Sequence, residues 1–253
     1  MSEVQAYISP VLANFPFMET FGLRPYTDPR EPAVFFGCYR GVDLHAIERH
    51  RGRAILLWAG RDIIKFRHNH HRLGTVIDVA FLPSIQEEVI RRRGRCFLAP
   101  YPLMKGQRLD PRKKGEAVYA YYQKNGSYGV SGRPLLSNWI KEWYPVKLPS
   151  KNKRVSWNLW YDGFSDSYYN VFAGLMLSNY ARGATSIADL GLRGIPCVTN
   201  IGKFPNALNW KKIDDIQGHL KEQSKKVGTV DRELAEKTYE FLDKKYRWVN
   251  SLI

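Results

Sequence analysis

Short apolar runs alternate with helical segments along most of this chain, and this alternation limits its fold more than any other feature. Strands are predicted at 33–37 (AVFFG), 54–58 (AILLW), 75–81 and 95–98. Helices are predicted between them at 43–50 and 84–93, the second with Ser84 as its N-cap and Glu87 three residues later. Strands that alternate with helices favour a parallel sheet covered by helices, which is an α/β fold.

The same alternation resumes after a linker at 101–116 that is rich in proline, glycine and basic residues. Strands are predicted at 117–122, 155–160, 172–177 and 197–200, and helices at 133–143, 185–192, 213–224 and 231–248. Before residue 33, Pro10, Pro16, Pro25 and Pro29 predict an irregular stretch. We therefore expect one α/β domain at 1–110, a second at 116–230, and a final helical segment at 231–253.

Composition excludes several other classes of protein. Hydrophobic residues make up 44% of the 253 residues and aromatic residues 13%, so the chain can bury a core and is not disordered. No apolar run reaches the roughly 18 residues of a membrane span, and MSEVQAYISP does not resemble a signal peptide. Cys38, Cys96 and Cys197 are too widely separated to predict a disulfide framework or a structural zinc site. A cytoplasmic location is expected.

The net charge of +15, from 39 basic and 24 acidic residues, is spread over both halves of the chain. Such a surface attracts phosphate groups in nucleic acids, nucleotides or anionic membranes. The predicted polyanion contacts are Arg49, Arg51, Arg53, Arg61, Lys65, Arg67, Arg91, Arg92 and Arg93. The alternative is that these residues form only a solvated face. Residues 67–72 (RHNHHR) hold clustered histidines, but no Cys or paired acid completes a ligand set, so no metal is expected.

The segment 172–200 carries the pattern most informative about chemistry. A strand leads into a loop containing Gly183, a helix then starts near Thr185 and Ser186, and Asp189 follows one turn later. Backbone N–H groups and the helix dipole at such a loop bind phosphate, with the hydroxyls as further donors. Asp189 is then placed to bond the sugar hydroxyls of a nucleotide. The alternative is an ordinary strand–helix turn, since many contain glycine and serine.

Two groups of motifs give this chain a family resemblance. Asp189, Gly194 and Pro196 form an acid-x4-Gly-x-Pro pattern that resembles the C-terminal donor motif of GT-B glycosyltransferases. In the first half, FGCYRGVD at 36–43, HRG at 50–52 and LWAGRDI at 57–63 resemble compact glycosyltransferases, many of them encoded by viruses and phages. The matched pieces cover about a third of the chain, and the order of elements covers nearly all of it.

The resemblance implies two Rossmann-like domains that face each other across a cleft, with the final helix returning to the first domain. It implies a nucleotide-sugar donor, expected to be a UDP-sugar such as UDP-glucose, bound mainly by the second domain. Asp189 takes the position of the acid that binds the donor ribose, Thr185 and Ser186 that of the phosphate turn, and Gly37 and Gly60 line the cleft. GT-B enzymes generally need no bound metal, which agrees with the lack of a DxD motif.

The chain departs from the family pattern before the donor helix. Relatives carry an arginine in the preceding strand and a His-Asp-Gly-like turn, whereas residues 176–183 read MLSNYARG. Here Arg182, beside Gly183, can supply the positive charge. Inverting transfer also needs a base, for which Asp43, Asp62 and His50 are the candidates. As alternatives, Asp43 caps its helix, His50 caps the other end of that helix, and Asp62 pairs with a nearby arginine.

Three functions remain open. The first is a hexosyltransferase acting on hydroxymethylated pyrimidines in double-stranded DNA, with Tyr39, Trp58 or residues 119–122 stacking on bases. The second is a glycosyltransferase with a glycan, lipid or protein acceptor. The third is a non-catalytic nucleic-acid-binding protein on a degenerate GT-B scaffold. Binding of a nucleotide-sugar separates the first two from the third, and salt-dependent DNA binding separates the first from the second.

Overall fold

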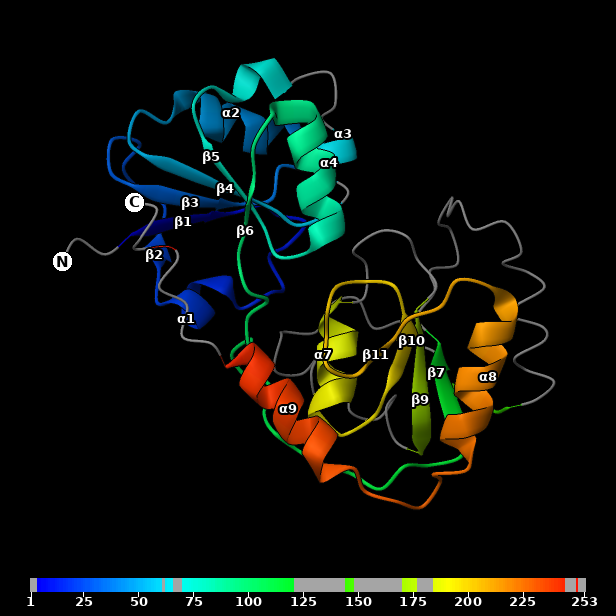
Figure 1. The fold of residues 1–253 in the computed structure, drawn as a ribbon. Coiled ribbons are helices and arrows are strands. Elements are labelled where there is room, and N and C mark those ends of the chain that lie inside the picture. The colour runs from blue at the N-terminus through cyan, green and yellow to red at the C-terminus, as the bar shows by residue number, and fades with distance from the viewer. Residues whose placement is uncertain are drawn as a thin grey trace. The chain divides into compact units, whose positions relative to one another are not determined.

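The computed structural model describes residues 4–60, 62–65, 70–120, 144–147, 170–176, 184–243 and 249. These residues form two compact α/β units, which are drawn as a ribbon in Figure 1. The first unit contains the described residues up to Lys105, together with Asp243 and Val249, and the second runs from Gly106 to Leu242. The chain therefore passes from the first unit to the second before Gly106, a few residues earlier than the sequence predicts.

The first unit is built on a six-stranded parallel sheet with the strand order β2-β1-β3-β4-β5-β6. Its elements are β1 (Gln5–Ile8), α1 (Phe17–Phe21), β2 (Arg24–Pro25), β3 (Ala33–Phe36), α2 (Gly41–Arg49), β4 (Ala54–Trp58), α3 (Asp62–Lys65), a 3-10 turn (His70–Leu73), β5 (Ile77–Ala80), α4 (Pro83–Arg93) and β6 (Phe97–Leu98). Every residue of β3 and β4 is buried, as expected of central strands in a sheet covered on both faces.

The prediction of an irregular N-terminal stretch is wrong. β1 lies inside the sheet between β2 and β3, and its buried Gln5 side chain accepts backbone N–H bonds from Thr27 and Asp28 at 2.6 and 2.8 Å. Pro25 lies in β2, an edge strand of two residues, where a missing N–H is tolerated. The residues of β1 pair with those of β3, which are far away in the chain, so the local sequence pattern does not predict this pairing.

The second unit contains a five-stranded parallel sheet with the order β11-β10-β9-β7-β8. Its elements are β7 (Ala117–Ala120), β8 (Val146–Lys147), β9 (Val171–Met176), α7 (Ala184–Leu192), β10 (Cys197–Thr199), β11 (Ala207–Leu208), α8 (Ile213–Ser224) and α9 (Arg232–Leu242). α7 covers one face of the sheet and α8 the other (Figure 1). Ile216 and Leu220 of α8 pack on Phe172 and Val198 of the sheet.

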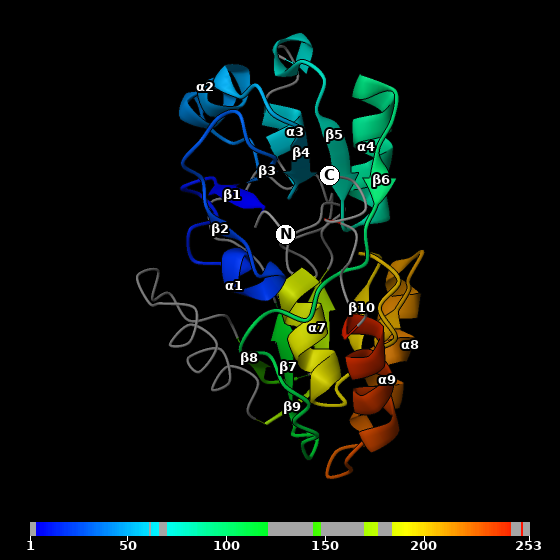
Figure 2. The same cartoon turned by 90° about the vertical axis from the view of Figure 1, so that its left-hand side faces the viewer.

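The last described helix, α9, ends at Leu242 and packs against α7 within the second unit, as Figure 2 shows. Only the residues after Leu242 are grouped with the first unit, and among them Val249 is buried. The helix predicted at 133–143 and the strand predicted at 155–160 lie outside the described residues.

Candidate functional site

Both sheets have a topological switch point, where successive connections leave the sheet in opposite directions. If the strands of each unit are numbered in chain order, their order across the sheet is 2-1-3-4-5-6 in the first unit and 2-1-3-4-5 in the second. In doubly wound sheets, ligands bind outside the carboxyl ends of the strands at this point. The switch points lie between β1 and β3 in one unit and between β7 and β9 in the other.

Asp43 organises the switch point of the first unit from the third position of α2. Its fully buried carboxylate accepts hydrogen bonds from the Tyr7 hydroxyl at 3.0 Å and the Ser9 hydroxyl at 2.8 Å. It also accepts the backbone N–H groups of Tyr39 and Arg40, each at 2.8 Å. These bonds join β1 to the loop after β3 and form the capping box of α2. The capping alternative for Asp43 is confirmed.

Asp62 has a similar role at the start of α3. Its fully buried carboxylate accepts the backbone N–H groups of Gly60 at 2.8 Å, Ala59 at 3.1 Å and Cys38 at 3.2 Å. Burial raises the pKa of Asp62 to about 6, although these N–H bonds act in the opposite direction. Asp62 thus ties the loop after β3 to the loop after β4 through backbone bonds, a role the sequence did not suggest.

His50 follows α2 as its C-cap residue, as the capping alternative expected. Its ring nitrogens lie 3.2 Å from the Tyr26 hydroxyl and 3.2 Å from the Arg53 carbonyl oxygen. Burial lowers the pKa of His50, so the ring is neutral at pH 7. Asp43, Asp62 and His50 are therefore all bonded within the first unit, and their role as catalytic base stays a prediction.

Gly37 and Gly60 end β3 and β4 at the same edge of the first sheet. Their φ angles of +78° and +146° favour glycine. A Cβ at Gly37 would lie 2.8 Å from Cε2 of Tyr39 and 2.9 Å from Cδ1 of Leu12. The Tyr39 ring therefore packs over Gly37, with its hydroxyl 3.9 Å from the Cβ position of Gly60. The sequence placed both glycines correctly at strand ends.

In the second unit, α7 follows β9, one of the two strands at the switch point. Thr185 and Ser186 occupy the second and third positions of the helix and are buried, whereas Arg182 and Gly183 lie outside the described residues. The first turn of α7 contains no acidic residue. Thr185 and Ser186 thus begin the helix that follows β9, and their role as a phosphate turn stays a prediction.

The N-terminus of α7 differs from those of four other described helices. α2 and α8 carry Asp43 and Asp215 at the third position, where each accepts two backbone N–H bonds of 2.8–3.0 Å. α3 begins with Asp62, and the N-terminus of α9 is capped by Asp231, which accepts the Leu234 N–H at 3.1 Å. In α7 the third position is Ser186. α4 likewise has no acidic residue in its first turn and carries Ser84 there, so α7 shares this feature with α4 and differs from α2, α3, α8 and α9.

Asp189 lies one turn further along α7, and its side chain is 1% exposed. Its Oδ1 accepts a hydrogen bond of 2.6 Å from Nε2 of Gln107, while the buried Arg193 donates to its backbone oxygen at 2.8 Å. Burial raises the pKa of Asp189 to about 6, against the lowering effect of the Arg193 charge and the Gln107 bond. Ribose binding by Asp189 stays a prediction. Gln107 was missed because it is 82 residues away in the chain, whereas the i,i+4 spacing of Asp189 and Arg193 was a local signal that the sequence analysis did not use.

The predicted cluster of three arginines on α4 is engaged within the first unit. Arg91 and Arg92 both pair with Glu88, and the Arg93 side chain, 10% exposed, pairs with Asp78 at 2.7 Å. The Arg93 guanidinium is thus held by Asp78, and phosphate binding by these arginines stays a prediction. Arg49, Arg51 and Arg53 are exposed, whereas Arg61, Arg67 and the Lys65 side chain lie outside the described residues.

The described residues contain neither a candidate metal-ion cluster nor a candidate membrane span. No group of three or more His, Cys, Asp or Glu side chains is arranged to hold a metal ion in that part of the chain. The histidine side chains at 68–71 are not among the described ones. Over the same residues, no helix is both long enough and apolar enough to cross a bilayer.

Comparisons with known proteins show a distant likeness to solved structures. No protein-family model and no curated protein matches the chain. Among solved structures, it is similar to the apo form of the lipopolysaccharide outer core galactosyltransferase WaaB, with 14% sequence identity and a TM-score of 0.48. The match covers 87% of this chain and 74% of that one. A likeness this distant defines no family for the chain.

Proposed function

We propose that this chain is a glycosyltransferase that takes a sugar from a nucleotide-sugar donor, with the donor diphosphate bound at the N-terminus of α7. The observation that carries the proposal is that α7, which follows a strand at the switch point, has no acidic residue in its first turn. α4 also has none, but it follows β5, away from the switch point of its sheet. A helix N-terminus attracts an anion, and α2, α3, α8 and α9 satisfy theirs with their own aspartates. α7 has hydroxyl residues there, at the switch-point strand of a doubly wound sheet.

The two units take different roles in this proposal. In the first unit, Asp43 and Asp62 already accept the N–H groups of Cys38, Tyr39 and Arg40. A phosphate at that loop would meet two buried carboxylates, so the donor belongs to the second unit and the acceptor to the first. This division agrees with the family resemblance of the motifs at 36–43 and 189–196.

During transfer, the bond from the anomeric carbon to the diphosphate breaks, a bond to the acceptor oxygen forms, and the acceptor hydroxyl gives up its proton, in an inverting reaction to a base such as Asp43, Asp62 or His50. The N-terminal N–H groups of α7, with Thr185 and Ser186, stabilise the negative charge on the leaving diphosphate. The resemblance assigns the donor ribose to Asp189, and because this carboxylate is 1% exposed and bonded to Gln107, a ribose hydroxyl would have to replace the Gln107 bond. We further propose a UDP-sugar donor and turnover that persists in EDTA, since the helix dipole takes the place of a divalent cation.

The donor site does not determine which molecule accepts the sugar. Hydroxymethylated pyrimidine in DNA was predicted from charge and from the virus-type motifs, and the pairing of Arg91, Arg92 and Arg93 with acids weakens that argument. A glycan, lipid or protein hydroxyl is the alternative. Transfer from the preferred donor to hydroxymethylated and unmodified duplex DNA, and to simple glycosides, decides between them.

The test places an aspartate where α2 and α8 already have one. Ser186→Asp should supply α7 with its own carboxylate at the third position and reduce UDP and UDP-sugar affinity at least tenfold, measured by calorimetry. Ser186→Asn is the matched control, because it has the same shape without the charge. Thermal unfolding of both variants checks that they fold. Equal affinity in the two variants, or no binding of any nucleotide-sugar by the parent, would overturn the proposal.

A further inference from the structure

A cationic surface lies on the second unit, at the edge of its sheet opposite the edge where α7 begins. Lys113 precedes β7, and the segment 225–231 follows the C-terminus of α8, so both belong to the amino edge of the sheet. They are joined by an antiparallel bridge between Lys113 and Val230. The backbone of Lys114 exchanges bonds of 2.8 Å with Gly228 and Thr229. These bonds hold the segment 225–231 against Lys113 and Lys114.

Positive charge is concentrated where these two segments meet, and we call this region the lysine surface. It comprises Lys113, Lys221, Lys225 and Lys226 with Val227 and Val230, all of them exposed. Lys225 pairs with Glu222, and the buried Lys114 pairs with Asp231 at 3.4 Å. Residues 113–114 and 221–231 thus hold five lysines against two acids. Burial, and to a smaller extent the nearby charge of Lys226, lowers the pKa of Lys114.

The lysine surface also presents apolar side chains to water. Val227 is 39% exposed and Val230 is 46% exposed, and both lie in the turn between the lysines. Lysines that surround projecting aliphatic groups suit the boundary of an anionic bilayer, where the charges meet lipid headgroups and the apolar groups enter the acyl boundary. A nucleic acid would not use the valines, and a second copy of the same surface would bring like charges together.

We propose that the lysine surface binds the face of an anionic lipid bilayer. The contact is peripheral and electrostatic, with Val227 and Val230 inserting between headgroups. This inference does not depend on the proposed glycosyl transfer, because it concerns the edge of the sheet opposite the donor site. Each exposed lysine should raise membrane affinity about fivefold at low salt.

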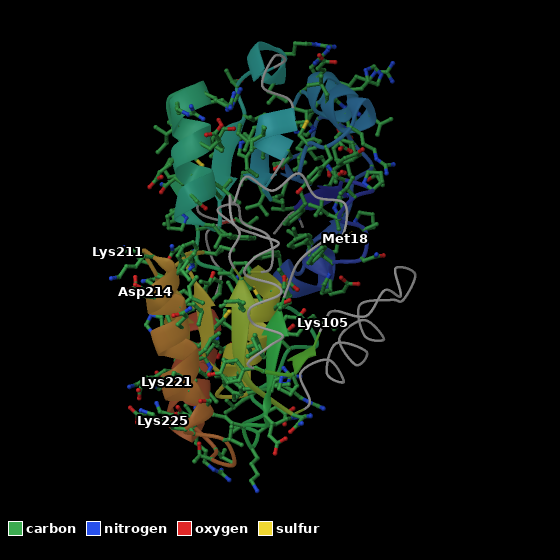
Figure 3. The ribbon with its side chains drawn as sticks, turned by 90° about the vertical axis from the view of Figure 1, so that its right-hand side faces the viewer. Met18, Lys105, Lys211, Asp214, Lys221 and Lys225 are labelled. Atoms are coloured by element: carbon green, nitrogen blue, oxygen red, sulfur yellow. The ribbon has the colours of Figure 1, made fainter. Side chains whose placement is uncertain are left out.

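Co-sedimentation of the full chain with vesicles tests the proposal. The parent should bind vesicles containing one third phosphatidylglycerol at low salt, release them at high salt, and ignore pure phosphatidylcholine. Lys113→Gln with Lys226→Gln should lower affinity for the anionic vesicles more than tenfold. The matched control is Lys203→Gln with Lys211→Gln, which removes the same charge from exposed lysines of the same unit. Lys211 and Lys225 lie at opposite ends of α8 (Figure 3).

Any one of four outcomes would overturn the proposal. One is that the parent does not bind anionic vesicles, and another is that the control pair lowers binding as much as the Lys113 and Lys226 pair. The third is that duplex DNA binds the lysine surface more tightly and displaces the vesicles. Val227→Ser with Val230→Ser should also weaken vesicle binding, and unchanged binding would show a purely ionic contact instead of a bilayer site. Thermal unfolding of each variant confirms that the fold is retained.

Discussion

At the scale of single residues, the chain places carboxylates in two kinds of buried setting. Asp43 and Asp62 are bonded to backbone N–H groups, whereas Asp189 is bonded to a side chain, Gln107, and lies near the charge of Arg193. Asp43, Asp62 and Asp189 were all predicted as site residues, because each follows a predicted strand. Their partners could not be predicted, because Gln107 is 82 residues from Asp189 in the chain.

Asp189→Asn should change how stability depends on pH. The folded pKa of Asp189 is about 6, above its ordinary value, so the folded state holds this proton more tightly than the unfolded chain. Its contribution to stability is therefore full below pH 4 and is lost as the pH rises through 6. Relative to the parent, the variant should gain about 2–3 kcal/mol between pH 4 and pH 7. Urea unfolding across this range measures the difference, and parallel curves would contradict it.

At the scale of elements, apolar pattern and strand length predicted most of the described fold. The strand at 54–58 and the helix at 213–224 have the predicted bounds. β1 and β2 were missed because their stability comes from pairing with β3 and with each other. α4 starts one residue before Ser84, because Pro83 fits the first helical position and Leu82 becomes the N-cap.

The turn after α7 provides a stability test at this scale. Gly194 has φ of +72°, and a Cβ there would lie 2.2 Å from the Asp231 carbonyl oxygen. Gly194→Ala should therefore lower the free energy of unfolding by more than about 2 kcal/mol. Gly218→Ala, inside α8 with nothing within 4 Å, should raise it by about 0.5–1 kcal/mol. Equal effects of the two changes in denaturant unfolding would refute this account of the turn.

At the scale of the whole molecule, the proposed function assigns nucleotide binding to one unit. Saturating UDP should therefore slow amide hydrogen exchange in α7 (Ala184–Leu192) and leave α2 (Gly41–Arg49) unchanged. The two helices are a matched pair, since each follows a strand at a switch point and only α2 has its own N-terminal carboxylate. Protection of α2 in place of α7 would assign the donor to the first unit and would refute the proposal.

The grouping of Asp243 and Val249 with the first unit bears on how the protein is made. A ribosome synthesises the first unit's sheet, then all of the second unit, and only then the residues that complete the first. The second unit, Gly106 to Leu242, is continuous and can fold as soon as it emerges. Val249 is buried and is grouped with the first unit, so during synthesis that unit cannot bury this side chain until the whole second unit has been made.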